Sequence, residues 1–347
     1  MPVSEETKIG LILVAIKQAS DIRRPLAYLR AQNNVEEIEL LLVAEHASVF
    51  DDLLPHETAG FGLVQTLSWG EPISNVDLAA AIAIRAAKSP VTAIIEDHVY
   101  LEPDWAQIIT ESFAANPEII GVGSAIELAN QSAALPWANH LFALSKYTPP
   151  VKSGLVPRVS RHHIAYRTSW LVQHDHELEG LLPRGGGIIE LAAKEGGLYM
   201  AADARLYHLT TSVWGPSLRI RVASGRASGS QPRLRSSLLR KLVASIQTPR
   251  LFYWRIRPQL SKYHRFHLRA LPIFLVSLLL MAVECFGYLL GIWAGPGDSE
   301  AVIAGHEAQR EKDVCEADIR YIDHHWPASG DGSPPPKPIE TTTTEAA

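Results

Sequence analysis

The feature that most constrains this chain of 347 residues is an apolar run of 24 residues, from Leu271 to Ala294. The run contains no lysine or arginine and a single acid, Glu284. About 20 such residues in a helix cross the hydrocarbon core of a bilayer. A charge at the centre costs about 2.5–3.5 kcal/mol, which the apolar neighbours outweigh. The sequence therefore predicts a transmembrane helix over 271–294, with a buried or interfacial helix as the alternative.

Charge is divided along the chain into three blocks. Residues 1–203 carry 25 acids and 14 bases, residues 204–283 carry 14 bases and no acid, and residues 296–347 carry 11 acids and 4 bases. A basic block can bind nucleic acid or anionic lipid headgroups. Because this block precedes the apolar run, we expect lipid and no nucleic acid. Positive charge also marks the cytoplasmic side, so the sequence predicts a single-pass chain with residues 1–270 in the cytoplasm.

In the first 210 residues, apolar runs typical of β-strands alternate with helical segments. Strands are expected over 8–16, 35–43, 62–67, 91–95, 119–123 and 198–207, helices over 22–32, 75–87, 105–115 and 188–194, and a loop-rich segment over 125–157. Asn75 is a natural helix N-cap. This alternation predicts an α/β fold, with a mostly parallel open sheet and helices on both faces.

The strand over 91–95 ends in three potential ligands, Glu96, Asp97 and His98. In an open α/β sheet, ligands bind beyond the carboxyl ends of the strands. Carboxylates and an imidazole at this place can hold a divalent cation or hydrogen-bond a sugar. The alternative is that Glu96 and Asp97 cap the next helix or face solvent. Glu45 and His208 also follow expected strands.

The order of these segments resembles a family-2 glycosyltransferase with the GT-A fold. The segment 75–105, with its helix, strand, Glu-Asp-His triplet, proline and tryptophan, resembles the family's Asp-x-Asp segment. Residues 162–171 (HHIAYRTSWL) resemble its Asn-x-Ala-x-Arg-x-x-Leu segment, and 190–208 and Ser224-Gly-Arg226 resemble two later ones. The similarity covers about residues 8–230, and a trailing transmembrane helix is common in the family.

The resemblance implies an inverting, membrane-anchored glycosyltransferase. It would move a sugar from a nucleotide-sugar donor to a glycan or lipid-linked acceptor. Glu45, Glu96 and Asp97 would bind the donor, while Asp97, His98 and His208 would hold Mn²⁺ or Mg²⁺. An imidazole in place of the last aspartate suits Mn²⁺ or Zn²⁺ better than Mg²⁺. The cation would stabilise the departing diphosphate, and a carboxylate would accept the proton of the acceptor hydroxyl.

One departure from the family concerns the catalytic base. The family's Glu-Asp pair should fall near Gly187-Ile188, where neither residue can accept a proton. Glu190 is the nearest carboxylate and the candidate base, or else an ordinary helix residue. A second hypothesis stays open: a catalytically weak relative that binds nucleotide or glycan as a membrane assembly partner. A third hypothesis, a soluble nucleotidyltransferase, would require that residues 271–294 do not enter a membrane.

Two groups of residues that include histidines could bind ligands, but each also has an interpretation without a functional role. His162 and His163 could bind acceptor or sugar, although a surface loop is the preferred interpretation. Cys315, His324 and His325 fit no zinc spacing and are expected in a solvated tail. The predicted domains are a GT-A-like domain over 1–235, a basic juxtamembrane segment over 236–270 with a helix over 238–246, a transmembrane helix over 271–294, and an acidic, largely disordered, Pro/Thr-rich tail over 295–347.

Overall fold

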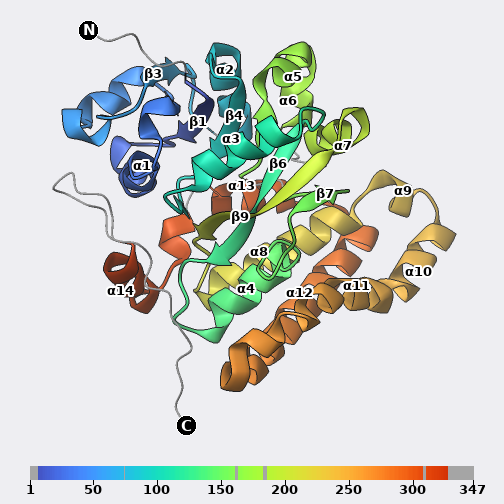
Figure 1. Cartoon of the computed structure of the whole chain (residues 1–347). Coiled ribbons are helices and arrows are strands. Elements are labelled where there is room, and N and C mark those ends of the chain that lie inside the picture. The colour runs from blue at the N-terminus through green and yellow to red at the C-terminus, as the bar shows by residue number, and fades with distance from the viewer. Residues whose placement is uncertain (1–6, 74, 161–162, 183–185, 308–309, 327–347) are drawn as a thin grey trace, which may run out of the picture. The chain divides into compact units, whose positions relative to one another are not determined.

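The computed structural model describes residues 7–73, 75–160, 163–182, 186–307 and 310–326 (Figure 1). The chain forms two compact units, and each is assembled from separate segments. The first unit comprises Met1–Ala125, Lys152–Tyr207 and Arg320–Ala347, and the second comprises Ile126–Val151 and His208–Ile319. The predicted domain over 1–235 therefore contains parts of both units.

A nine-stranded sheet forms the centre of the first unit. Its order is β3-β2-β1-β4-β8-β6-β9-β5, and β7 pairs with β9. The strands are β1 (Ile9–Val14), β2 (Ile38–Ala44), β3 (Leu63–Ser68), β4 (Val91–Ile95), β5 (Val99–Leu101), β6 (Gly121–Leu128), β7 (Gly154–Val156), β8 (Ala165–Arg167) and β9 (Leu198–His208).

The sheet has a parallel part and an antiparallel part. Strands β3, β2, β1 and β4 are parallel, and Ile9 of β1 lies opposite both Ile38 and Val91. Every residue of β1 and β2 is buried, as expected for strands covered on both faces. Strand β8 runs antiparallel to both β4 and β6. The predicted α/β class with an open sheet is confirmed.

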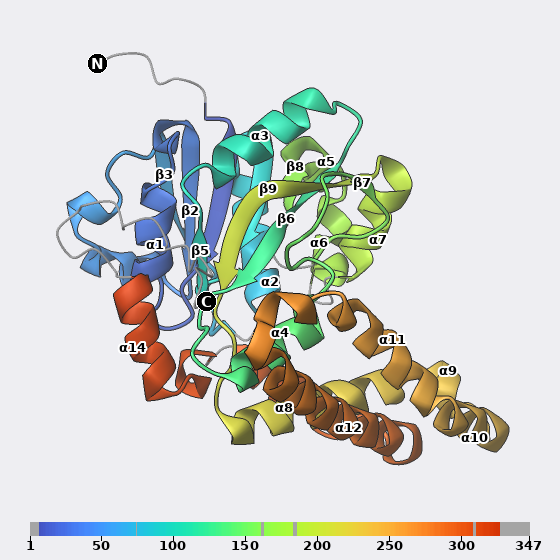
Figure 2. The same ribbon diagram turned by 60° about the horizontal axis from the view of Figure 1, so that its bottom comes forward.

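Helices of the first unit surround this sheet (Figure 2). They are α1 (Arg23–Arg30), α2 (Val76–Ala86), α3 (Trp105–Ala115), α5 (Thr168–Gln173), α6 (Leu178–Leu181) and α7 (Gly186–Glu195). Asn75 caps α2 as predicted, because its Oδ1 accepts a hydrogen bond of 3.2 Å from the backbone N–H of Leu78. The sequence thus indicated α1, α2, α3 and α7 to within a few residues.

The described part of the tail predicted over 295–347 contains helices. Helices α13 (Ser299–Glu307) and α14 (Glu316–His325) lie within it, and residues 327–347 are outside the described part. Trp326 supplies the physical reason, because its buried ring packs against Tyr28, Tyr100 and Tyr207 of the first unit. The ring centroids are 5.5, 5.3 and 4.3 Å away.

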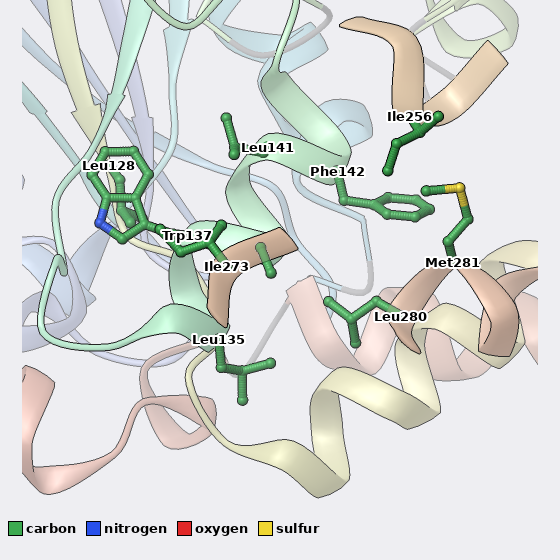
Figure 3. Close-up of a cluster of buried hydrophobic side chains, with 10 residues drawn as sticks. Leu128, Leu135, Trp137, Leu141, Phe142, Ile256, Ile273, Leu280 and Met281 are labelled. Atoms are coloured by element: carbon green, nitrogen blue, oxygen red, sulfur yellow. The ribbon is translucent and has the colours of Figure 1, made fainter. Parts of the chain in front are cut away.

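The second unit is helical. It contains α4 (Ala134–Leu144), α8 (Trp214–Gly229), α9 (Pro232–Arg235), α10 (Leu238–Ile246), α11 (Thr248–Leu260), the short turn η6 (Tyr263–Arg269), α12 (Ala270–Ala294) and α13. Its core joins side chains of α4, α11 and α12, including Phe142, Ile256 and Met281 (Figure 3). The prediction of a loop-rich segment over 125–157 is wrong for residues 134–144, which form α4. Most side chains of this helix are buried, so it belongs to the core of the second unit.

Candidate active site

The turn after β4 holds two carboxylates around one imidazole. His98 is buried, with 3% of its side chain exposed. Its Nδ1 lies 2.6 Å from Oδ1 of Asp97, and its Nε2 lies 3.2 Å from Oε2 of Glu96. Both ring nitrogens therefore face carboxylates. This arrangement fixes the orientation of the two acids next to His98.

His163 approaches the same carboxylate from another segment. Its side chain is fully buried, and its Nε2 lies 3.2 Å from Oε2 of Glu96. His163 precedes β8, which pairs with β4, so the sheet order brings it to this place. Its φ of 57° lies in the left-handed region, which asparagine, aspartate and histidine adopt more often than other residues apart from glycine. The preferred interpretation of His163 as part of a surface loop was wrong, and His162 lies outside the described residues.

His208 completes the cluster from the last position of β9. It is 4% exposed, and its ligand atom lies within 4.8 Å of those of Glu96 and His163. One carboxylate oxygen and two imidazole nitrogens are a suitable donor set for Mn²⁺ or Zn²⁺. Ligand atoms about 2.1 Å from one ion are at most about 4.2 Å apart, so small side-chain shifts would bring all three onto an ion.

The other predicted site residues lie at three different places. Asp97 is next to Glu96 in the same turn, with 25% of its side chain exposed. Glu45 follows β2, and its Oε1 lies 3.5 Å from Nε2 of His46. Glu190 is exposed on α7. In the described part of the chain, neither Glu45 nor Glu190 forms a hydrogen bond or ion pair with the histidine cluster.

Two residues of the resembling segments hold the sheet in shape. Trp105, fully buried at the start of α3, donates from Nε1 to Oγ of Ser124 at 2.8 Å. Arg167 donates to the backbone carbonyls of Phe113, Asn116 and Ile119 at distances of 2.7–3.1 Å. These bonds join the end of α3 to β8, so the tryptophan and arginine of the motifs have structural roles here.

Comparisons with known proteins show which solved structures share this fold. No protein-family model matches the chain, and no curated protein matches it. A solved mannosyltransferase, PcManGT from Pyrobaculum calidifontis in complex with GDP-Man and Mn²⁺, has 12% sequence identity and a TM-score of 0.51. The alignment covers 84% of this chain and 88% of that one. The fold is that of a GT-A glycosyltransferase.

Two further structures are similar over smaller shares of their length. GalNAc-T7 with UDP, GalNAc and Mn²⁺ has 15% identity and a TM-score of 0.45, with 58% of this chain and 43% of that one covered. TarS of S. aureus has 14% identity and a TM-score of 0.41, with 63% and 40% covered. The present chain thus spans less than half of either of these two.

Proposed function

We propose that the chain is a glycosyltransferase that uses a nucleotide-sugar donor and a divalent cation. The observation that carries this proposal is the cluster of Glu96, His163 and His208 at the strand ends of a GT-A sheet. Ligands of open α/β sheets bind at such strand ends. A cation there would supply positive charge to the departing diphosphate.

We assign the cation ligands to Glu96, His163 and His208. The sequence prediction was Asp97, His98 and His208, so Glu96 now replaces Asp97 and His163 replaces His98. Both nitrogens of His98 already face carboxylates. His98 would then orient Glu96 and Asp97, as partners outside the ligand sphere commonly do. Asp97 is the more exposed of the two acids and remains the candidate contact to the donor.

The acceptor side of the proposal rests on the sequence. Glu190 stays the candidate base, in an inverting reaction on a glycan or lipid-linked acceptor at the cytoplasmic face of a membrane, with Glu45 near the donor. Among the described residues, one helix, Ala270–Ala294, is long and apolar enough to cross a membrane. Among the described residues, Glu190 forms no hydrogen bond or ion pair with the cluster, so a relative that binds nucleotide without transfer is the second candidate.

The test is a thermal-shift titration of the full chain with Mn²⁺ and with UDP-, GDP-, TDP- and CDP-sugars. A ligand that binds the folded state raises the melting temperature. We expect a Mn²⁺-dependent shift that His163→Asn abolishes, since asparagine tolerates the positive φ at this position. The matched control is His176→Ala, whose side chain is 77% exposed.

Two outcomes separate the candidate functions. A His163→Asn variant that folds and responds to Mn²⁺ like the unchanged protein would rule out the assigned cation site. A donor that binds with no release of its sugar, in both the unchanged chain and Glu190→Gln, would favour the non-catalytic relative. Sugar release that falls in Glu190→Gln while donor affinity is kept would support the enzyme and its base.

A further inference from the structure

We propose that the second unit binds one leaflet of an anionic membrane through exposed apolar side chains of α10, α11 and α12, with α12 lying in the membrane plane. This inference goes beyond the proposed function and does not depend on catalysis. It also differs from the sequence prediction of a spanning helix. The argument begins with the two faces of α12.

Helix α12 has its polar and small residues on the protein side. Its buried stripe contains Ser277, Glu284, Gly287 and Gly291 together with the apolar residues Ile273, Leu280, Met281 and Ile292. Its exposed stripe consists of large apolar residues: Leu271, Leu275, Leu279, Phe286 and Trp293. Small and polar residues at helix contacts, with apolar residues outside, are typical of helices packed in a lipid environment.

A glycine seam joins α12 closely to α8, and the two helices lie side by side (Figure 2). Gly225 and Gly229 of α8 meet Gly287 and Gly291 of α12. A Cβ on any of these glycines would lie 2.1–2.2 Å from a carbonyl oxygen of the other helix. The backbones are therefore in direct contact, and α8 covers one side of α12.

The surroundings of α12 argue against a span. Helix α8 carries Arg219, Arg221 and Arg226, and α13 packs on α8 as well. If α12 crossed the bilayer, these arginines would enter the hydrocarbon, where arginine is among the least favourable residues. Only the exposed stripe can meet lipid without burying them, and this requires α12 to lie along the surface.

Glu284 agrees with this arrangement. Its carboxylate is 5% exposed, and its oxygens lie 3.1 Å from Nη2 of Arg255 and 3.7 Å from Nη1 of Arg221. The acid that counts against a lipid environment therefore faces arginines inside the second unit. It would remain on the protein side when the opposite stripe meets lipid.

Helix α10 is also turned with its apolar side outward. Leu238, Leu239, Leu242, Val243 and Ile246 are 44–77% exposed and follow the spacing of one helix face. Ala244 faces the protein instead. The helix touches the end of α12, where Trp293 donates from Nε1 to Oγ of Ser245 at 3.1 Å. Both helices thus present apolar side chains to solvent.

The charge of this region fits an anionic leaflet. Residues 204–283 contain 14 arginines and lysines and no acid. On α11, Tyr253 and Trp254 are about half exposed, and the guanidinium of Arg257 lies 5.8 Å from the ring centroid of Trp254. Aromatic side chains prefer the headgroup region, and each basic side chain near an anionic surface adds to binding. A lipid surface therefore fits better than a purely apolar partner.

The topology test uses two single cysteines that flank α12. Cys285 and Cys315, the free cysteines of the described chain, are replaced by alanine, and Leu268→Cys or Glu300→Cys is added. Leu268 is 96% exposed, and Glu300 is exposed on α13. Sealed membrane vesicles are treated with a membrane-impermeant maleimide before and after detergent. We expect both cysteines to label from the same side, and labelling from opposite sides would overturn the proposal.

The binding test uses the full chain and sedimentation with lipid vesicles. We expect stronger binding to vesicles that contain about one third phosphatidylglycerol than to pure phosphatidylcholine. Leu239→Glu should weaken binding roughly tenfold or more, because a charge replaces a leucine that enters the lipid. Leu155→Glu on β7 is the matched control, since Leu155 is 68% exposed and Leu239 is 71% exposed.

A second copy of the chain is the competing occupant of this surface. Sedimentation velocity without lipid tests it with the same variants. If Leu239→Glu dissociates an oligomer and leaves vesicle binding unchanged, the surface joins copies and the membrane proposal fails. If the variant loses vesicle binding with its oligomeric state unchanged, the membrane proposal is supported.

Discussion

His163 and His140 are both buried, but their surroundings differ. His163 faces a carboxylate oxygen of Glu96 at 3.2 Å, in the candidate active site. His140 lies on α4 in the second unit, and its Nε2 lies 3.0 Å from the hydroxyl of Thr148. Burial away from water, with a smaller effect of the charge on Arg265, lowers the pKa of His140 to about 3. His140 is therefore neutral throughout the usual pH range.

The low pKa of His140 predicts a loss of stability in acid. In the unfolded chain a histidine has a pKa of about 6.5. Above that pH both states are neutral and the contribution is fully present. As the pH falls from 6.5 toward 3, the unfolded state binds a proton that the folded state does not, so the free energy of unfolding decreases. The loss at pH 5 is about 2 kcal/mol.

Denaturant unfolding of the full chain at pH 7.5 and pH 5 measures this effect. His140→Gln replaces the imidazole with a hydrogen-bonding amide that does not titrate. The difference in the free energy of unfolding between the two pH values should therefore shrink by about 2 kcal/mol. His176→Ala, an exposed histidine, provides the control. An equal acid sensitivity in His140→Gln and the unchanged protein would show that another group causes it.

At the scale of elements, the seam between α8 and α12 makes the sharpest prediction. A Cβ at Gly287 would lie 2.2 Å from the carbonyl oxygen of Val222. Gly287→Ala should therefore force the helices apart and destabilise the protein by about 1–3 kcal/mol or more. Gly215→Ala on α8 is the matched control, because nothing lies within 4 Å of its Cβ position. Gly215 is the second residue of α8, so alanine there should leave the stability unchanged or raise it slightly.

The thermal unfolding midpoints of the two glycine variants test whether α8 and α12 are in backbone contact. The prediction holds if Gly287→Ala melts lower, and Gly215→Ala melts at or above, the temperature of the unchanged protein. Equal melting of both variants would mean that α8 and α12 are not in backbone contact.

The local pattern of apolar residues was sufficient to predict individual strands and helices, but not which of them would pack side by side. Alternating apolar runs gave β1, β2, β4 and β9, and the Glu-Asp-His triplet pointed to the end of β4. The sequence could not show that β8 would lie beside β4, because about seventy residues separate them and only the assembled sheet sets that order. His163 was missed for this reason. The pairing of α12 with α8 could have been predicted from the sequence, because both helices contain a Gly-x-x-x-Gly spacing, at 225/229 and 287/291.

At the scale of the whole molecule, each unit depends on distant parts of the chain. The first unit includes Arg320–Ala347, and its Trp326 is 3% exposed against three tyrosines. Arg24 and Asp323 add an ion pair of 2.5 Å between α1 and α14. A cut at residue 235, the predicted end of the domain, would leave Tyr28, Tyr100 and Tyr207 without this cover.

Trp326→Ala should accordingly destabilise the first unit by about 3–5 kcal/mol, the usual range for a buried tryptophan. Trp214→Ala should have a much smaller effect, because Trp214 is 45% exposed at the start of α8. Thermal unfolding of both full-length variants is the measurement. If the two substitutions lower the melting temperature equally, Trp326 does not stabilise the first unit as its packing indicates.

The place of Trp326 in the chain has a consequence for biosynthesis. Ribosomes make proteins from the N-terminus, so α10, α11 and α12 leave the exit tunnel before the tryptophan that covers the tyrosines of the first unit. If the second unit binds lipid as proposed above, the nascent chain could therefore reach a membrane while its first unit is still incomplete. Under that proposal, the first unit would complete its folding on chains that are already bound to lipid.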